Sequence, residues 1–390
     1  MTLSLSKTLK SKFFYLIIWF SLSLAIVLKN LIRGDFPNNY IIFKYNFIHL
    51  IAQKNLFLAY PQRYFDLNHY GPLFGLIIAP FTVFPDQIGV LLWVAFNCWI
   101  LYVAVFQLPL SEIQKLMILL ICSHELMTSS ASVQSNPLIT ALIILSFCFI
   151  TKGKDFWATM MIILGTLIKL YGIVGIVFYL FSKNKSMFRR SLIFWTLILL
   201  LLPALVSSPQ FIIQTYHDWY FDLINKNLAN ATSIMQNISV MGMIERIFSV
   251  SISNLWIIIP ALTIYFLPLV RYKLYQNQRF QLLILSSTLI FTVIFSSAAE
   301  SPTYIIAFLG VAIWFVTLPK PISKFNIGLF IFALLLTSLS PSDLFPKYIR
   351  INYIIPYGLK ALPCFLIWLK IIKETMQPKV FFQAQSDKNL

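Results

Sequence analysis

Charged residues are scarce in this chain, and their scarcity excludes an ordinary soluble protein. Of its 390 residues only 11% are charged, whereas a soluble domain carries roughly 25%. Hydrophobic residues make up 59% of the sequence, more than one core can bury, so lipid must cover the rest. The aromatic share of 16% suits belts of Trp and Tyr at the two membrane interfaces. We therefore predict an all-α polytopic integral membrane protein.

Acidic residues are scarcer still, with 13 Asp and Glu against 30 Lys and Arg and a net charge of +17. In a soluble protein this excess would suggest a nucleic-acid partner. Here the basic residues stand in short clusters between apolar runs, such as Lys7 with Lys10, Lys152 with Lys154, and Arg189 with Arg190. Such clusters mark cytoplasmic loops. The prediction is therefore no nucleic acid, membrane lipids as surroundings, and cytoplasmic N and C termini.

Motifs for metals and nucleotides are also lacking. The four cysteines lie in apolar runs without a CxxC pair, so neither a zinc site nor a disulfide framework is indicated. The four histidines are too scattered to predict a metal site. The sequence has no glycine-rich phosphate loop, so ATP is not expected. We predict a protein without metal or cofactor.

Apolar runs recur along the whole chain, and a spanning helix needs about 20 such residues, with a lower limit near 17. The first run, from Phe13 to Leu28, ends at Lys29 and Arg33 without a cleavage pattern, so we expect a retained helix rather than a signal peptide. A single transmembrane domain over residues 1–390 is predicted, with about twelve helices, several of them short. They are expected near residues 12–33, 88–107, 114–130, 137–151, 155–168, 170–182, 188–206, 253–271, 279–297, 302–318, 323–340 and 353–373.

Two long stretches are predicted to lie on the non-cytoplasmic side. Outer loop 1, about residues 34–87, contains two short segments that mix apolar residues with polar residues or prolines, and we expect juxtamembrane helices near 38–51 and 71–85. Outer loop 2 covers about residues 207–252. The polar residues from about 374 to 390 are expected to form a cytoplasmic tail.

Basic residues flank the stretch from Lys154 to Lys183 at both ends, so one spanning helix cannot satisfy the charge rule. A hairpin of two short helices, each roughly 20 Å long, keeps both ends in the cytoplasm. Its turn is Lys169-Leu170-Tyr171-Gly172, which is expected within or near the outer leaflet.

This topology sorts the acidic residues to one face. Four of them, Glu112, Asp155, Glu374 and Asp387, are predicted to be cytoplasmic. The others are predicted to lie outside: Asp35, Asp66, Asp86, Glu125, Asp218, Asp222, Glu245, Glu300 and Asp343. Acidic residues avoid basic loops in any case, but their distribution also predicts one polar site on the non-cytoplasmic side.

Three charged residues have both a structural and a functional interpretation. Asp35, in Gly34-Asp35-Phe36-Pro37, either ends the first helix in a local turn or acts as a general base at the membrane surface, where partial burial would favour proton transfer. Lys169 interrupts an apolar run, where a lysine either snorkels or contacts a lipid phosphate. Glu300 either caps the helix that Pro302 begins or holds a substrate hydroxyl.

Uncharged polar side chains occur in the same predicted outer segments. They are Tyr70 before the second juxtamembrane segment, Gln134 and Asn136 in a short turn, and Asn237 and Ser239 in outer loop 2. Each can be an ordinary turn residue. Together, beside an apolar groove, they suit a polyhydroxylated substrate.

In the order of its short motifs the sequence resembles glycosyltransferase family 87, whose members are polytopic enzymes with the GT-C fold. The resemblance covers roughly residues 30 to 350, and its specificity lies in the order of the motifs. These are Gly34-Asp35-Phe36, Asn39-Tyr40, Tyr70-Gly71-Pro72-Leu73-Phe74, Ala79-Pro80-Phe81, Trp93 with Asn97, Gln134 with Asn136, Ile168-Lys169-Leu170, and Asn237 with Ser239. The family often has a histidine in the later Ser-Pro turn, where this chain has Glu300-Ser301-Pro302-Thr303.

The resemblance implies a mannosyltransferase-like enzyme that uses a polyprenyl-phosphate sugar donor on the non-cytoplasmic face and a lipid or glycan acceptor. It assigns the role of base to Asp35 and a phosphate contact to Lys169, and Arg63 in outer loop 1 is a second candidate for that contact. It also suggests a bacterial inner membrane. An inverting, metal-independent transfer is expected. A transporter or lipid flippase has similar features, although its site must be reachable from both sides. A polymerase or ligase of lipid-linked glycans would use a pyrophosphate-linked donor instead.

Overall fold

The computed structural model describes residues 12–231, 233 and 235–377, and within these residues all regular elements are helices, without a strand. The all-α prediction is therefore confirmed. Lys7, Lys10 and tail residues 378–390 lie outside the described residues. The chain folds as two compact units, which are described separately. The first comprises the residues up to Leu108 and Leu126–Ala229, and the second comprises Pro109–Glu125 and the residues from Asn230 onward.

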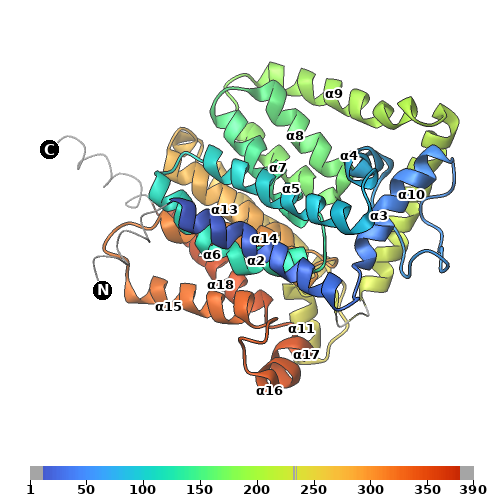
Figure 1. Ribbon diagram of the computed structural model, residues 1–390. Coiled ribbons are helices and arrows are strands. Elements are labelled where there is room, and N and C mark those ends of the chain that lie inside the picture. Colours follow the sequence, from blue (N-terminus) through green and yellow to red (C-terminus); the bar gives the residue numbers. More distant parts are fainter. Residues whose placement is uncertain (1–11, 232, 234, 378–390) are drawn as a thin grey trace. The chain divides into compact units, whose positions relative to one another are not determined.

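Unit 1 is built around α7 (Asn136–Thr151), whose side chains are buried from Asn136 to Cys148. A helix that is apolar on all sides needs neighbours on all sides, and α7 packs against α5, α8 and η1. Figure 1 shows α5, α7 and α8 side by side. The elements of this unit are α2 (Lys12–Ile32), α3 (Asn38–Ile51), α4 (Pro72–Thr82), α5 (Asp86–Gln107), α7, α8 (Asp155–Ile168), η1 (Leu170–Phe181), α9 (Lys185–Leu201), η2 (Leu202–Leu205) and most of α10 (Pro209–Ala231).

Unit 2 is built around α14 (Tyr304–Val316), which is buried from Tyr304 to Trp314 and packs against α13 and α18. Figure 1 draws α13 beside α14. The elements are the first part of α6 (Glu112–Ala131), α11 (Val240–Phe248), α12 (Leu255–Phe266), η3 (Leu267–Val270), η4 (Tyr272–Leu274), α13 (Gln278–Ile294), η5 (Ser301–Thr303), α14, α15 (Lys324–Ala333), η6 (Leu334–Leu339), α16 (Lys347–Ile349), η7 (Arg350–Ile354), α17 (Ile355–Tyr357) and α18 (Ala361–Met376).

Several helices begin where the sequence supplies a side-chain cap. Asn184, Ser239, Asn277 and Ser323 each accept a hydrogen bond from the backbone N–H three residues later. This bond satisfies one of the N–H groups that a helix start leaves without a partner. The starts of α9, α11, α13 and α15 are therefore set locally by the chain.

Among the described residues, three helices are long and apolar enough to cross a bilayer, namely α2, α5 and Lys185–Leu205. A fourth candidate is the pair Lys347–Tyr357 and Ala361–Met376, which is bent by 62°. The other apolar helices have 10–17 residues. By length and composition the chain is a membrane protein, and the count of about twelve spans stays a prediction.

Most sequence-based helix positions are confirmed as helices. The predicted juxtamembrane segments 38–51 and 71–85 correspond to α3 and α4. The predicted hairpin is α8 and η1, and it breaks at Lys169, whose backbone is extended. The two arms cross so closely that a Cβ on Gly172 would lie 2.2 Å from the carbonyl carbon of Gly165. Glycine at position 172 is therefore needed for this crossing.

The prediction of one continuous helix over 353–373 is wrong. The chain bends by 62° between α17 and α18, and Gly358 has a φ of +63°, which only glycine adopts easily. Outer loop 2, for which no helix was predicted, contains the 23-residue helix α10 and the shorter α11. Both helices mix polar and apolar residues, so no apolar run marks them.

Candidate functional site

Lys169, at the break between α8 and η1, lies beside the start of α7. Its ammonium donates a hydrogen bond to Asn136 Oδ1 at 2.9 Å, and Asn136 Nδ2 donates to Gln134 Oε1 at 2.6 Å. The same ammonium lies 5.1 Å from the centre of the Tyr171 ring. The structure thus brings together three of the residues that the sequence analysis selected, and it places a cation next to two amides.

Tyr70 joins this group through the next residue of the turn. The Ser135 hydroxyl donates to the Tyr70 hydroxyl oxygen at 3.0 Å. The Tyr70 ring stacks on Phe74 with 4.4 Å between ring centres. We call Tyr70, Gln134, Asn136 and Lys169 the Lys169 group.

Helix α5 holds the turn that carries Gln134 and Asn136. Trp93 Nε1 donates to the Val133 carbonyl at 3.2 Å, and Asn97 Oδ1 accepts from the Leu138 N–H at 3.2 Å. Val133 itself has a φ of +54°, a strained value for a β-branched residue. Trp93 and Asn97 were selected only through the family resemblance, and their contacts now give them a physical role.

Unit 1 also contains an apolar groove of about 440 Å³ whose lining comes close to the Lys169 group along the chain. Its wall includes Ile168, the residue before Lys169, and Leu138, two residues after Asn136. Gln107 and Lys154, near the opposite ends of α5 and α7, also line it. The rest of the wall is apolar: Ile77, Phe96, Ile100, Val103, Leu142, Leu145, Phe149, Met161 and Leu164. Its volume falls within the roughly 300–1,000 Å³ that small-molecule sites occupy. The groove thus includes residues one and two positions away from Lys169 and Asn136 in the chain.

Asp35 lies at the end of α2 and is exposed, whereas the functional interpretation expected partial burial. Gly34 adopts a φ of +80°, and the Asp35 N–H donates to the Asn30 carbonyl at 3.0 Å. This is a helix-ending turn of the kind that the structural interpretation expected. The exposed side chain follows a backbone turn that these features fix.

Arg63 is also exposed and lies between α3 and α4, with its guanidinium 5.8 Å from the centre of the Tyr45 ring. Tyr45 belongs to an aromatic cluster with His49, Tyr60 and Tyr64. Burial, aided by the charge of Lys54, lowers the pKa of His49 to about 4. Burial raises the pKa of Tyr64 to about 12. The structure therefore places Arg63 beside this aromatic cluster.

In unit 2 the structure brings together Asn237, Ser239 and the turn that carries Glu300. The Ser239 hydroxyl donates to Asn237 Oδ1 at 2.6 Å and accepts from the Gly242 N–H, which caps α11. The Ile238 N–H donates to the Ala299 carbonyl at 2.8 Å, and the Tyr304 hydroxyl donates to the Ile238 carbonyl at 2.7 Å. The loop 237–239 is therefore fixed against the turn 299–304.

Glu300 forms a capping box with Thr303 at the start of η5, and its backbone N–H donates to Thr303 Oγ1 at 3.3 Å. The capping interpretation is confirmed. A contact between Glu300 and a substrate stays a prediction.

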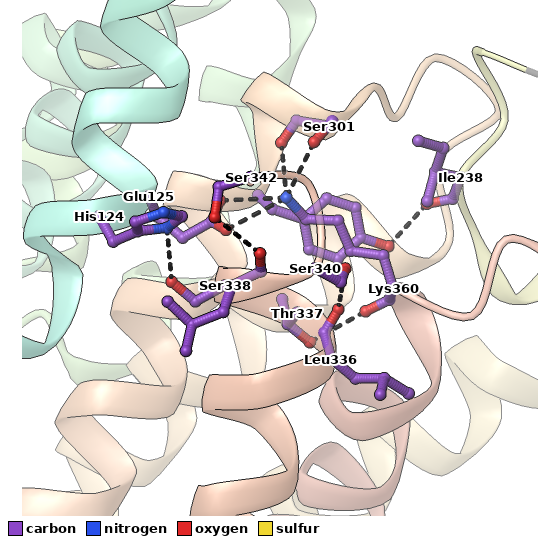
Figure 2. Close-up of polar contacts among 12 residues, drawn as sticks. His124, Glu125, Ile238, Ser301, Leu336, Thr337, Ser338, Ser340, Ser342 and Lys360 are labelled. Carbon is purple, nitrogen blue, oxygen red and sulfur yellow. Dashed lines mark hydrogen bonds and ion pairs between the residues drawn. The ribbon is translucent and has the colours of Figure 1, made fainter. Parts of the chain in front are cut away.

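The sequence analysis missed the ion pair of Glu125 and Lys360 in unit 2, which Figure 2 shows with its neighbours. Lys360 Nζ lies 3.1 Å from Glu125 Oε1, and the two side chains are 4% and 0% exposed. The signal was present, because Lys360 interrupts an apolar run as Lys169 does. It was hidden by the prediction of one continuous helix there.

Within the described ranges, no group of three or more His, Cys, Asp and Glu side chains could hold a metal ion. His69 and Asp222 form a pair, with 2.9 Å between Nδ1 and Oδ2.

The helices and their polar turns define a helical membrane protein. The family model of glycosyltransferase family 87 matches residues 68–297, more than half of the chain. The chain belongs to glycosyltransferase family 87 and is a glycosyltransferase, which acts on a sugar donor and an acceptor. No curated protein matched the sequence. The matched region contains the Lys169 group, Asn237 and Ser239, whereas Asp35, Arg63 and Glu300 lie outside it.

Proposed function

We propose that the enzyme transfers a sugar, with mannose as the first candidate, from a polyprenyl-phosphate donor to a hydroxyl of a lipid or glycan acceptor on the non-cytoplasmic face. The observation that carries this proposal is the Lys169 group together with the apolar groove that Ile168 and Leu138 help to line. A phosphate with a long apolar tail needs a cation for its head and an apolar surface for its chain, and here the residue before the cation lines the groove.

The donor phosphate would contact Lys169, with Arg63 as a second candidate, and the first prenyl units would lie along Leu138, Leu142 and Ile168. Polar ends with an apolar body are typical of small-molecule sites. Tyr70, Gln134 and Asn136 would bind polar parts of the substrate. We assign the same kind of role to Asn237, Ser239 and Glu300 in unit 2.

The chemistry would be a single displacement at the anomeric carbon. Asp35 takes the proton of the acceptor hydroxyl, the acceptor oxygen forms the new bond to the anomeric carbon, and the bond to the phosphate oxygen breaks. The leaving phosphate keeps the electron pair, and Lys169 balances its charge. Attack from the opposite side inverts the anomeric centre. One lysine suffices for a monophosphate leaving group, so we propose transfer without a metal ion.

We further propose a GT-C fold with about twelve spans, both termini in the cytoplasm and a location in a bacterial inner membrane. Family membership and the basic clusters between apolar runs support this arrangement.

The test uses purified wild type and Asp35→Asn in detergent with EDTA present. Transfer from polyprenyl-phosphate mannose to a panel of lipid and glycan acceptors is measured. Transfer by wild type and loss of it in a folded Asp35→Asn supports donor, base and metal independence together. Equal transfer by both proteins would show that Asp35 is a turn residue and not the base.

A second donor panel separates the alternatives. Transfer only from a pyrophosphate-linked glycan donor would indicate a polymerase or ligase. If neither donor class is used and a polar or lipid-linked solute crosses vesicles that contain the protein, the transporter hypothesis replaces the proposed transfer.

A further inference from the structure

The Lys360 ammonium lies where three segments of unit 2 meet (Figure 2). It donates to Glu125 of α6 at 3.1 and 3.3 Å, and to the carbonyl and hydroxyl oxygens of Ser301 at 3.1 and 3.0 Å. It also lies 4.9 Å from the centre of the Tyr304 ring. One cation thus binds α6, the start of η5 and the start of α14.

The bend between α17 and α18 determines where this ammonium lies. Gly358, with its φ of +63°, ends α17, and Lys360 occupies the position before α18. The Thr337 hydroxyl donates to the Lys360 carbonyl at 2.9 Å, which fixes the backbone of the bend. The backbone of the bend therefore sets the position of the Lys360 side chain.

Stability alone does not explain a pair so deeply buried. Removing a cation and a carboxylate from water costs free energy that their attraction only partly returns, and apolar replacements are often neutral. The particular consequence of this pair is that it holds a neighbouring turn in place. Glu125 fixes the ammonium, and the ammonium in turn fixes both oxygens of Ser301, the residue after Glu300.

The same contacts extend to the loop that carries Asn237 and Ser239. Tyr304, under the ammonium, donates to the Ile238 carbonyl, and the Ile238 N–H donates to the Ala299 carbonyl. Arg246 holds the approach to this loop by donating to the carbonyls of Ser233 and Gln236, both at 3.0 Å.

We infer that Glu125 and Lys360 form a positioning pair that holds the turn 299–304 and, through it, the loop 237–239, so that Glu300, Asn237 and Ser239 are in place before substrate binds. The inference rests on the proposed function, in which these three side chains contact substrate.

The main test is the paired variant Glu125→Leu with Lys360→Met, which removes both charges and leaves no buried ion alone. A matched control is Arg279→Met with Glu374→Leu, which removes the 3.5 Å ion pair between α13 and α18 in the same unit. Three quantities are compared with wild type: thermal stability, kcat and KM for donor and acceptor, and hydrogen exchange of peptides covering 236–242 and 297–304.

The Glu125–Lys360 variant should keep a stability close to that of the control, raise one KM about 10-fold with a smaller change in kcat, and exchange faster only in these two peptides. The control should keep both KM values and the exchange pattern of wild type. Unchanged KM and exchange in the Glu125–Lys360 variant would show that the pair is merely structural.

If that variant does not fold, Ser301→Ala decides instead, because it removes one acceptor of Lys360 and leaves the ion pair intact. It should raise the same KM about 3-fold and speed exchange of 297–304, and wild-type values would overturn the inference. If wild type itself transfers no sugar, the proposed function fails. The exchange measurement then decides the positioning step alone, and wild-type exchange in the variant would overturn it.

Discussion

Lys169 Nζ and Asn136 Oδ1 are joined by a 2.9 Å hydrogen bond, although 33 residues separate them in the chain. The bond connects a helix break to a helix start. Ile168, next to Lys169 in the chain, and Leu138, two residues after Asn136, both line the apolar groove. A phosphate that enters this place would meet a cation whose position is already fixed, which is the arrangement that stabilises developing charge best.

If Lys169 binds the leaving phosphate as proposed, Lys169→Met should lower kcat/KM for the donor about 100-fold, because that phosphate would lose its cation. Lys183→Met is the matched control, since that lysine is exposed and lies after η1, at the other end of the hairpin arm. Initial rates at varied donor concentration give the comparison. A Lys169→Met enzyme with wild-type kcat/KM would show that the lysine only snorkels.

Val103→Trp should narrow the groove and so raise KM for a long-chain donor about 10-fold, equivalent to about 1.4 kcal/mol. A donor with a very short tail should be nearly unaffected, because it does not reach that part of the wall. Ile193→Trp on α9, with a side chain 63% exposed, controls for bulk added elsewhere on the apolar surface. Equal effects on both donors would argue against the groove as the tail site.

The helices were largely predictable because an apolar run is a local property of the chain. The break at Lys169 was predictable too, since basic residues at both ends of one stretch demand two crossings. The bend at Gly358 was missed although Pro356, Gly358 and Lys360 interrupt the apolar run from Tyr353 to Lys373. Its direction also depends on partners distant in the chain, such as Thr337. Helix α10 was missed because it mixes polar and apolar residues, so no continuous apolar run marks it in the sequence.

The residues of the candidate site likewise fall into those that the sequence indicated and those that it did not. Gln134, Asn136 and Lys169 were selected from their sequence contexts, and their contact follows from the hairpin and the position of α7. Glu125 and Lys360 are 235 residues apart, and no local pattern links two residues at that distance. Only the packing of α6 beside the bend reveals the pair.

His49 should make the protein less stable in acid. Its pKa is about 4 in the folded protein against an ordinary 6.5, so between these values the unfolded state binds more protons. Stability is therefore full above pH 6.5 and falls as pH drops toward 4, by at most about 3 kcal/mol. His49→Phe should flatten the dependence of Tm on pH between 7.5 and 4.5. Parallel curves for both proteins would rule out His49 as the source.

Two roles of the Glu300 side chain, the helix cap and a contact with substrate, can be distinguished by substitution. Glu300→Gln keeps a side-chain acceptor for the helix start and should leave Tm unchanged, whereas Glu300→Ala should cost about 1 kcal/mol. If the carboxylate also binds a substrate hydroxyl, Glu300→Gln lowers kcat/KM at unchanged stability. Full activity in Glu300→Gln would leave Glu300 with the cap alone.

Gly358, at the bend before Lys360, should be hard to replace. At a φ of +63° an alanine is strained, and its Cβ would lie 3.0 Å from an Arg246 guanidinium nitrogen. Gly358→Ala should therefore destabilise the protein by about 1 kcal/mol or more, and it should raise KM because the bend aims Lys360. Gly328→Ala is the control, since a Cβ there meets nothing within 4 Å and a helical alanine is favoured. Denaturation midpoints and KM of both variants give the comparison. A Gly358→Ala protein as stable and active as Gly328→Ala would mean that the bend tolerates another backbone conformation, and that its glycine does not determine where the Lys360 ammonium lies.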